Sequence, residues 1–284
     1  MYVTTFYSFK GGVGRTMALV NVAVALANRG RRVLAVDFDL DAPALDTFDV
    51  MRPRGQVPGI IDFVNEYLIS GQAPDVQRFI GEAAHTGGEG GGLWIMPSVR
   101  RETYSANFHH IDWRALYDER DGYLLFEDLK EQWKRFVEPD YVLIDSCTGH
   151  TDAGGICTRQ LPDSVAVLFI PNEQNLRGLT RVVRDIRAEA SEPRCKAITL
   201  HFIMSNVPDL DDEDGVLSDT IKAFQEQLGF RREPFIVHRN DSLSLLNQVV
   251  FTRDRPTSRL AREYRELVRE IAGHDEVERE STVG

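Results

Sequence analysis

The sequence predicts an α/β fold with a doubly wound, mostly parallel sheet flanked by helices. Short runs of β-branched and aromatic residues alternate with longer helical patterns, as expected when right-handed crossovers join parallel strands. Several of these runs are apolar throughout, which is typical of strands that are covered on both faces. The first run ends in a glycine-rich turn that leads directly into an apolar helical segment.

The periodicity of apolar residues predicts the individual elements. Strands are expected at 2–9, 32–37, 93–97, 141–145, 164–170, 197–205 and 234–238. Helices are expected at 16–30, 59–70, 74–83, 123–137, 173–190, 215–228, 242–249 and 256–272. A surface insertion is expected at 100–122, with a short helix at 111–118. We expect one domain at 1–273 and a charged, flexible tail at 274–284, because no linker-like break divides the chain.

Composition limits the classes of function. The chain has 284 residues and a formal net charge of −11. An acidic chain is a poor candidate for binding nucleic acid or an anionic membrane, because their phosphates would repel it. No apolar run approaches the roughly 20 residues needed to span a bilayer. Cys147, Cys157 and Cys195 contain no C-x-x-C pair, so we expect no disulfide framework and a bacterial cytoplasmic protein.

The glycine-rich turn reads KGGVGRT and has the features of a phosphate-binding loop. Gly11, Gly12 and Gly14 let the backbone curl with its N–H groups pointing inward, and the following helix adds the positive end of its dipole. A standard loop reads G-x-x-x-x-G-K-[ST], but here Phe9 replaces the first glycine and Arg15 replaces the lysine. A plain glycine turn is the competing interpretation, although three glycines exceed what a turn between a buried strand and a buried helix requires.

The turn resembles the deviant Walker A loop of the MinD/ParA ATPases, K-G-G-x-x-K-[ST]. Lys10 matches the early signature lysine, and the chain is similar to the branch whose loop reads K-G-G-V-G-R. In that family the early lysine reaches across a nucleotide-sandwich dimer to the partner's phosphates. The resemblance therefore implies ATP and Mg²⁺ as cofactors, a nucleotide-dependent homodimer and an unidentified protein partner. It implies a nucleotide-contacting loop made of Lys10, Gly11, Gly12, Val13, Gly14, Arg15, Thr16 and Met17.

The segment VLAVDFDLDAPAL (33–45) resembles switch I of the same family. The resemblance implies that Asp37 holds a magnesium-bound water and that Asp39 orients the attacking water. Asp41 lies near and could share or take the role of Asp39. The hydroxyl of Thr16 can add a magnesium ligand.

The segment YVLIDSCTG (141–149) resembles Walker B and switch II, and the family order of segments is kept along the chain. The resemblance implies that Asp145 supports magnesium and that Gly149 senses the γ-phosphate. Both Asp37 and Asp145 follow apolar strands, which should end beside the loop at the carboxyl edge of the sheet. FIMSNVPD (202–209) resembles the strand end that reads adenine, here through Asn206.

The replacement of the usual loop lysine by Arg15 determines the rate of ATP hydrolysis that we expect. Arginine is longer and planar and binds oxygens two at a time, so it can preserve attraction for phosphate while it shifts the geometry. Only stabilisation that is specific to the transition state speeds chemistry. We therefore expect a weak ATPase with Lys10, Arg15 and Asp39 as catalytic residues, acting as a nucleotide-gated switch with slow or partner-stimulated hydrolysis. The alternatives are a non-hydrolysing binding module in a regulatory or defence assembly, a DNA-partition ATPase and an amidotransferase-type synthetase.

Two surface features bear on partners. Arginines 177, 181, 184 and 187 recur at helical spacing and could bind DNA, but we favour a solvated face paired with Asp185 and Glu189. The amphipathic segment 258–273 carries interspersed glutamates, so we expect it to pack on the core and not to anchor a membrane.

Overall fold

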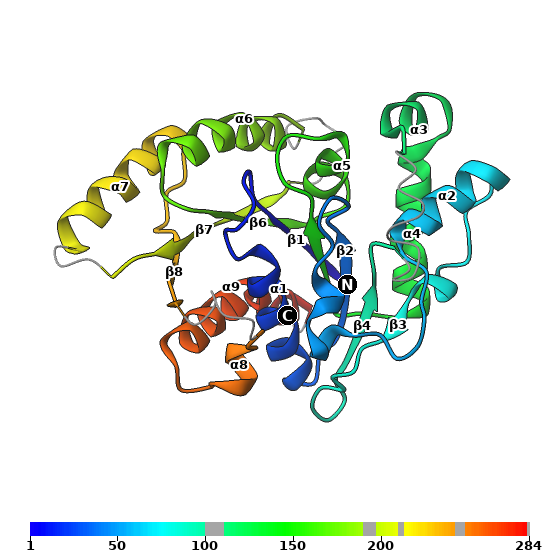
Figure 1. The fold of residues 1–284 in the computed structure, drawn as a ribbon, viewed down its shortest axis with the longest axis horizontal. Coiled ribbons are helices and arrows are strands. Elements are labelled where there is room, and N and C mark those ends of the chain that lie inside the picture. Colours follow the sequence, from blue (N-terminus) through cyan, green and yellow to red (C-terminus); the bar gives the residue numbers. More distant parts are fainter. Residues whose placement is uncertain (100–110, 190–196, 210–212, 242–247, 283–284) are drawn as a thin grey trace.

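The computed structural model describes residues 1–99, 111–189, 197–209, 213–241 and 248–282. Within them, a single sheet runs through the molecule in the order β3-β4-β2-β5-β1-β6-β7-β8 (Figure 1). The strands are β1 (Tyr2–Tyr7), β2 (Arg32–Phe38), β3 (Gly81–Glu82), β4 (Gly92–Met96), β5 (Tyr141–Ser146), β6 (Ser164–Phe169), β7 (Thr199–Val207) and β8 (Phe235–His238). All pair in parallel except β3, which is antiparallel to β4. The predicted fold class is confirmed.

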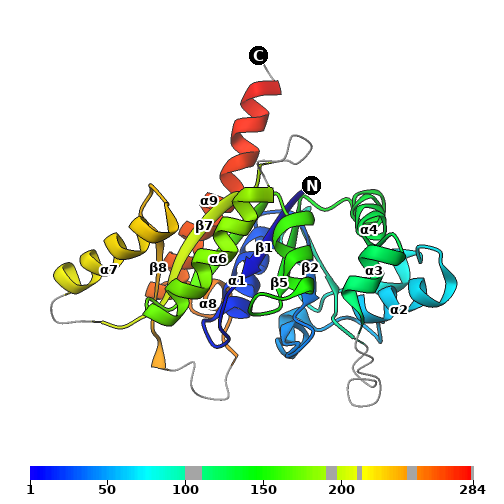
Figure 2. The same ribbon diagram turned by 90° about the horizontal axis from the view of Figure 1, so that it is seen from above.

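Helices cover both faces of the sheet. They are α1 (Arg15–Asn28), α2 (Ile60–Ser70), α3 (Trp113–Glu119), α4 (Gly122–Phe136), α5 (Asp152–Gly155), α6 (Glu173–Glu189), α7 (Glu213–Leu228), α8 (Phe251–Asp254) and α9 (Arg259–Thr282). Helices α1, α8 and α9 share one buried core on one face. On the other face, α2–α5 cover the β2/β4 half and α6 and α7 cover the β6–β8 half (Figures 1 and 2). No helix in these ranges is long and apolar enough to cross a bilayer.

Helix α1 shows why the sequence folds this way. Its residues from Ala18 to Ala27 are all buried, which matches its apolar composition on every side. Gly14 precedes the helix in the left-handed region with φ 82°, and Gly30 follows it with φ 79°. Glycine adopts this region without the steric cost of a Cβ atom, so both ends of the helix are set by the sequence.

Most predicted elements are present, and the differences have local causes. The helix predicted at 74–83 is wrong. A short 3₁₀ turn occupies Val76–Phe79, where Asp75 accepts a hydrogen bond from the Gln77 N–H at 3.0 Å, and β3 follows. Gly81 lies so close to Val57 that a Cβ atom there would be 2.7 Å from its side chain. The chain at Gly81 packs this closely because glycine has no side chain, and it continues there as the edge strand β3 and not as a helix.

Other elements also differ from the sequence-based expectations. The short helix α5 is present although the sequence did not predict it. Of the helix expected at 242–249, residues 242–247 lie outside the described residues, and the next helix begins at Phe251. Helix α9 continues to Thr282, beyond the expected end at 272. In the insertion, α3 confirms the short helix expected at 111–118, while 100–110 lie outside the described residues.

Candidate functional site

The glycine-rich loop lies at the carboxyl edge of the sheet, between the end of β1 and the start of α1. Gly12 and Gly14 have φ angles of 75° and 82°, which residues with side chains rarely adopt. A Cβ atom added at Gly11, Gly12 or Gly14 would meet no atom within 4 Å. Gly12 and Gly14 are therefore required by backbone conformation, and the space above the loop is open. This arrangement matches a loop whose N–H groups and helix dipole receive an anion.

The first residues of the loop have separate environments. The Phe9 ring packs against α6, where a Cβ atom added at Gly178 would lie 2.2 Å from the ring. Lys10 is exposed, and its Nζ lies 5.6 Å from the centre of the Phe9 ring. No ion pair joins Lys10 to a residue in the described ranges, so its charge is available to a ligand or to a second molecule.

The two predicted magnesium aspartates stand side by side. Asp37 on β2 is the register partner of Asp145 on β5, and both side chains are buried. Asp37 accepts hydrogen bonds from the backbone N–H groups of Asp39 at 3.1 Å, Leu45 at 3.1 Å and Ala44 at 3.2 Å. Burial and the neighbouring Asp145 carboxylate raise the pKa of Asp37 well above its ordinary value. Two carboxyl groups therefore lie side by side at this edge, and a nearby cation would favour the ionised form of Asp37.

Arg15 supplies the opposing charge. Its side chain turns inward, where its Nε donates to the Asp145 Oδ1 at 2.5 Å and its Nη2 pairs with the Asp39 Oδ2. Its Nη1 also lies 3.3 Å from the Ser8 hydroxyl, and the residue is only 6% exposed. Although burial opposes the charged form, the carboxylates of Asp145 and Asp39 hold the pKa of Arg15 above its ordinary value. The guanidinium is a buried cation between Asp39, which follows β2, and Asp145 on β5.

Thr16 completes the group of polar side chains. Its Oγ1 donates to the Asp145 Oδ2 at 2.6 Å, so both Asp145 oxygens accept hydrogen bonds from the loop and the start of α1. In the described part of the chain, no group of three or more His, Cys, Asp or Glu residues is placed to hold a metal ion alone. Mg²⁺ usually takes one or two carboxylates and completes its shell with water and phosphate oxygens. The set of Thr16, Asp37 and Asp145 fits that pattern.

Asp39 and Asp41 are distinguished by burial. Asp39 is 6% exposed and touches Arg15, whereas Asp41 is exposed and lies outside the contacts of the site. Burial raises the pKa of Asp39, and Arg15 opposes that rise. Of the two residues, only Asp39 belongs to the cluster.

The segment after β5 contains contacts that the sequence did not suggest. Gly149 has φ 76°, and its carbonyl accepts a hydrogen bond from the Tyr7 hydroxyl at 3.0 Å. His150 Nε2 lies 2.9 Å from the Asp185 Oδ2 on α6. Asp152 is exposed in the first turn of α5 and does not join the cluster. Tyr7 ends β1, a strand that the sequence predicts to be buried. A tyrosine in such a place is a sequence signal for a contact of this kind, because a buried tyrosine hydroxyl usually finds a hydrogen-bond partner.

Asn206 lies near the end of β7, next to the loop. Its φ of 57° is in the left-handed region, and its Nδ2 lies 3.4 Å from the Gly12 carbonyl oxygen. An exposed amide side chain beside the loop has both a donor and an acceptor to offer to a nucleobase. The structure therefore brings Asn206 close to the loop.

The arginines of α6 are largely paired with their neighbours. Arg177 pairs with Glu173, while Arg181 and Arg184 lie 4.0 and 3.6 Å from Asp185. Arg187 instead donates to the Leu228 carbonyl at 2.7 Å. The expected pairing with Asp185 is confirmed, whereas the Glu189 side chain lies outside the described part of the structure.

Comparison with known proteins gives consistent results. The family model for the CobQ/CobB/MinD/ParA nucleotide binding domain matches residues 4–272. The septum site-determining protein MinD of Helicobacter pylori is 26% identical over 199 residues, covering 70% of this chain and 63% of that relative. The chain thus spans less than two thirds of that protein.

Solved structures with a similar fold include the ATP complex of McdA from Cyanothece. It has a TM-score of 0.71 and 17% identity, with 96% coverage of both chains. A chain of the MinC:MinD cell division protein complex from Aquifex aeolicus has a TM-score of 0.58 and 20% identity, covering 86% of this chain and 84% of that one.

Proposed function

Because the chain belongs to the CobQ/CobB/MinD/ParA nucleotide-binding family, we propose that it is a Mg·ATP-dependent switch. In this proposal, ATP binding closes a homodimer that recruits a protein partner, and slow or partner-stimulated hydrolysis of ATP to ADP and phosphate reopens it. The observation that carries the proposal is the convergence of the glycine loop, Thr16, Asp37, Asp145 and Asn206 at one edge of the sheet.

The loop and Asn206 would bind the nucleotide. The backbone N–H groups from Lys10 to Met17 would surround the phosphates, and Asn206 would read the adenine. Thr16, Asp37 and Asp145 are the residues that would hold Mg²⁺ and its water ligands. The ion, when bound, neutralises charge that develops on the phosphate oxygens. Gly149, fixed by the Tyr7 hydroxyl, would contact the γ-phosphate and report its presence to the segment that follows.

Lys10 supports the dimer part of the proposal. It is exposed at the start of the loop and forms no ion pair with a described residue, so it can reach a nucleotide that is bound to a second copy of the chain. A cation that crosses the interface contributes only when ATP is present in the partner. Dimerisation would thereby depend on nucleotide.

Arg15 explains why hydrolysis would be slow. The guanidinium is held by Asp39 and Asp145, so it must leave one or both carboxylates before it can stabilise charge on a transferring phosphoryl group. Asp39 must also leave Arg15 before its carboxylate can orient water. Breaking a buried charge pair leaves an uncompensated charge unless new partners replace it. The γ-phosphate and a partner protein are the groups that could supply such replacements.

The same ion pair favours a second candidate, a nucleotide-dependent binding module without useful hydrolysis. If Arg15 stays paired with Asp39, ATP would stabilise the dimer but would not be cleaved. Phosphate release by the wild-type chain, measured together with size-exclusion chromatography in ADP, ATP and a non-hydrolysable ATP analogue, separates the candidates. An ATP-dependent dimer that releases phosphate supports the switch, and a dimer that persists without phosphate release supports the binding module.

A further inference from the structure

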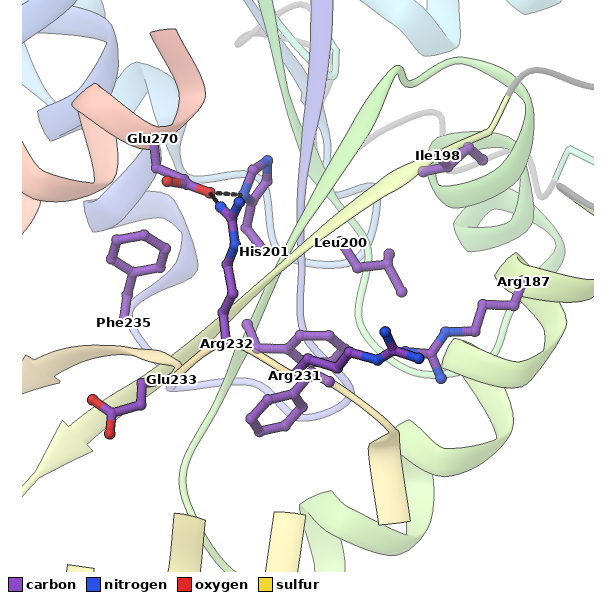
Figure 3. Close-up of a pocket in the computed structure, with 11 residues that line it drawn as sticks. Arg187, Ile198, Leu200, His201, Arg231, Arg232, Glu233, Phe235 and Glu270 are labelled. Carbon is purple, nitrogen blue, oxygen red and sulfur yellow. Dashed lines mark hydrogen bonds and ion pairs between the residues drawn. The ribbon is translucent and has the colours of Figure 1, made fainter. Parts of the chain in front are cut away.

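A pocket of about 340 Å³ lies at the amino end of β7 (Figure 3). It is built where β7 begins, around Leu200 and Phe202, and where the chain leaves α7 for β8, around Phe230. Asn206 lies at the opposite end of β7, and six residues of extended strand separate it from Leu200 by roughly 20 Å. The pocket is therefore distinct from the candidate nucleotide site.

One wall of the pocket is apolar. The rings of Phe202 and Phe230 stack with their centres 4.6 Å apart and an angle of 26° between their planes. Ile198 and Leu200 extend this wall, and all four residues line the pocket. Aromatic and aliphatic surface suits an apolar group, an aromatic one included, because burial of such a group removes apolar area from water.

One end of the pocket is cationic. Arg187 and Arg231 both line it, and their guanidinium ends point toward each other in Figure 3. Arg187 is held in place by the carbonyl groups of Leu228 at 2.7 Å and Gly229 at 3.3 Å. Arg231 is exposed and has no ion pair or hydrogen bond to any residue in the described ranges. An oxyanion bound between two guanidinium groups would be attracted to both.

The other end of the pocket has a different polarity. The Arg232 Nη1 lies 3.3 Å from the Glu270 Oε1, and His201 Nδ1 lies 3.6 Å from the same oxygen. Glu233 points away from Arg187 and Arg231 in Figure 3. Glu233 and Glu270, the acidic side chains among the residues that line the pocket, therefore lie apart from Arg231 (Figure 3). An anion bound here would be oriented with its charge toward Arg231.

We propose that this pocket binds a small organic anion in which a carboxylate or phosphate group is attached to a flat aromatic body. The forked guanidinium of Arg231 would bind the oxyanion through two parallel hydrogen bonds, as guanidinium groups do with carboxylates and phosphates. The aromatic body would lie against Phe202 and Phe230. A pocket of this volume is at the lower end of the range for small-molecule sites, about 300–1,000 Å³.

Titration calorimetry of the full chain with 1-naphthoate tests the proposal, because this probe carries no phosphate that the loop could capture. We expect binding by the wild type, with a Kd raised about tenfold or more in Arg231→Ala, the loss of roughly 1.4 kcal/mol. Arg114→Ala on α3 removes an exposed arginine outside the pocket and should leave the Kd unchanged. Neutral 1-naphthalenemethanol should bind much more weakly than the carboxylate.

The outcomes are decisive in either direction. The proposal is overturned if 1-naphthoate fails to bind up to its solubility limit, if the neutral alcohol binds equally well, or if Arg231→Ala and Arg114→Ala behave alike. A comparison of benzoate with phenyl phosphate, run with the nucleotide site saturated by a non-hydrolysable ATP analogue, then shows which oxyanion the pocket prefers. Circular dichroism of each variant establishes that the exposed substitutions leave the fold intact.

Discussion

The Nε of Arg15 lies 2.5 Å from the Oδ1 of Asp145, and this contact joins the phosphate loop to the end of β5. The same guanidinium pairs with Asp39, so one cation connects the loop with the ends of both β2 and β5. A lysine in this place could not bridge two carboxylates through a rigid fork. The bridge between these two strand ends therefore depends on the arginine.

Replacement of Arg15 by lysine tests this effect on the reaction. Arg15→Lys should keep ATP affinity within a few-fold and raise the single-turnover rate of hydrolysis about tenfold or more, since the released Asp39 and a mobile ammonium can act on the transition state. Rapid-quench measurement of ADP formation gives the rate. A wild type that is already fast, or a lysine variant with an unchanged rate, contradicts the interpretation.

Asp39→Ala should remove the residue that is proposed to orient water without removing the magnesium residues. ATP should then hold the variant as a stable dimer, while the wild type returns to monomer as it hydrolyses ATP. Light scattering coupled to size-exclusion chromatography follows both species over time. If both proteins remain dimeric for equal periods, the chain is a binding module and not a hydrolytic switch.

Lys10→Ala should separate nucleotide binding from dimerisation. Because Lys10 is exposed and the loop backbone supplies most phosphate contacts, the monomer should still bind ATP, but ATP should no longer produce a dimer. Lys134→Ala, which removes an exposed lysine on α4, is the matched control and should dimerise like the wild type. Equal ATP-dependent dimerisation of the two variants would exclude a role for Lys10 across the interface.

Substitution of the loop glycines should change the free energy of unfolding by amounts that differ between positions. Gly14→Ala should lower the free energy of unfolding by about 1–2 kcal/mol, because an alanine at φ 82° is strained even where no neighbour lies within 4 Å. Gly11→Ala has the same open surroundings without a positive φ and should change stability by less than about 0.5 kcal/mol. Urea unfolding measures both variants. Equal losses would show that the left-handed backbone at Gly14 is not the cause.

Asn206→Asp tests base recognition. Aspartate resembles asparagine in shape and tolerance of the left-handed region, but its carboxylate only accepts hydrogen bonds. The amide serves a base edge with one donor and one acceptor, such as adenine, whereas the carboxylate suits an edge with two donors, such as guanine. The ratio of GTP to ATP affinity should therefore rise about tenfold or more, the equivalent of roughly 1.4 kcal/mol. An unchanged ratio in competition binding would remove Asn206 from the base site.

Much of this site could be predicted from the sequence for one physical reason. Parallel strands that are apolar throughout must be buried, and their carboxyl ends meet at one edge of the sheet. Asp37 and Asp145 follow such strands, and the structure pairs them in register. Likewise, the sequence predicted that Gly11, Gly12 and Gly14 let the backbone curl, and two of them, Gly12 and Gly14, have positive φ angles.

The remaining features depend on side-chain directions and on contacts between distant segments. Nothing in the residue type of Arg15 shows that its guanidinium turns inward to Asp39 and Asp145. The pocket around Arg231 brings together residues from α6, β7, the α7–β8 connection and α9, which no local pattern relates. The assignment of nucleotide and metal roles to the individual residues, and the division into a domain at 1–273 with a tail, stay predictions.

Isothermal titration calorimetry of the full chain with ATP at neutral pH, with and without Mg²⁺, tests the central claim most directly. The account predicts saturable heat from ATP with one site per chain, an affinity that increases with Mg²⁺, and a strong loss of binding in Asp145→Ala. No heat from any adenine or guanine nucleotide in the presence of Mg²⁺ would contradict the claim that this loop holds a nucleotide.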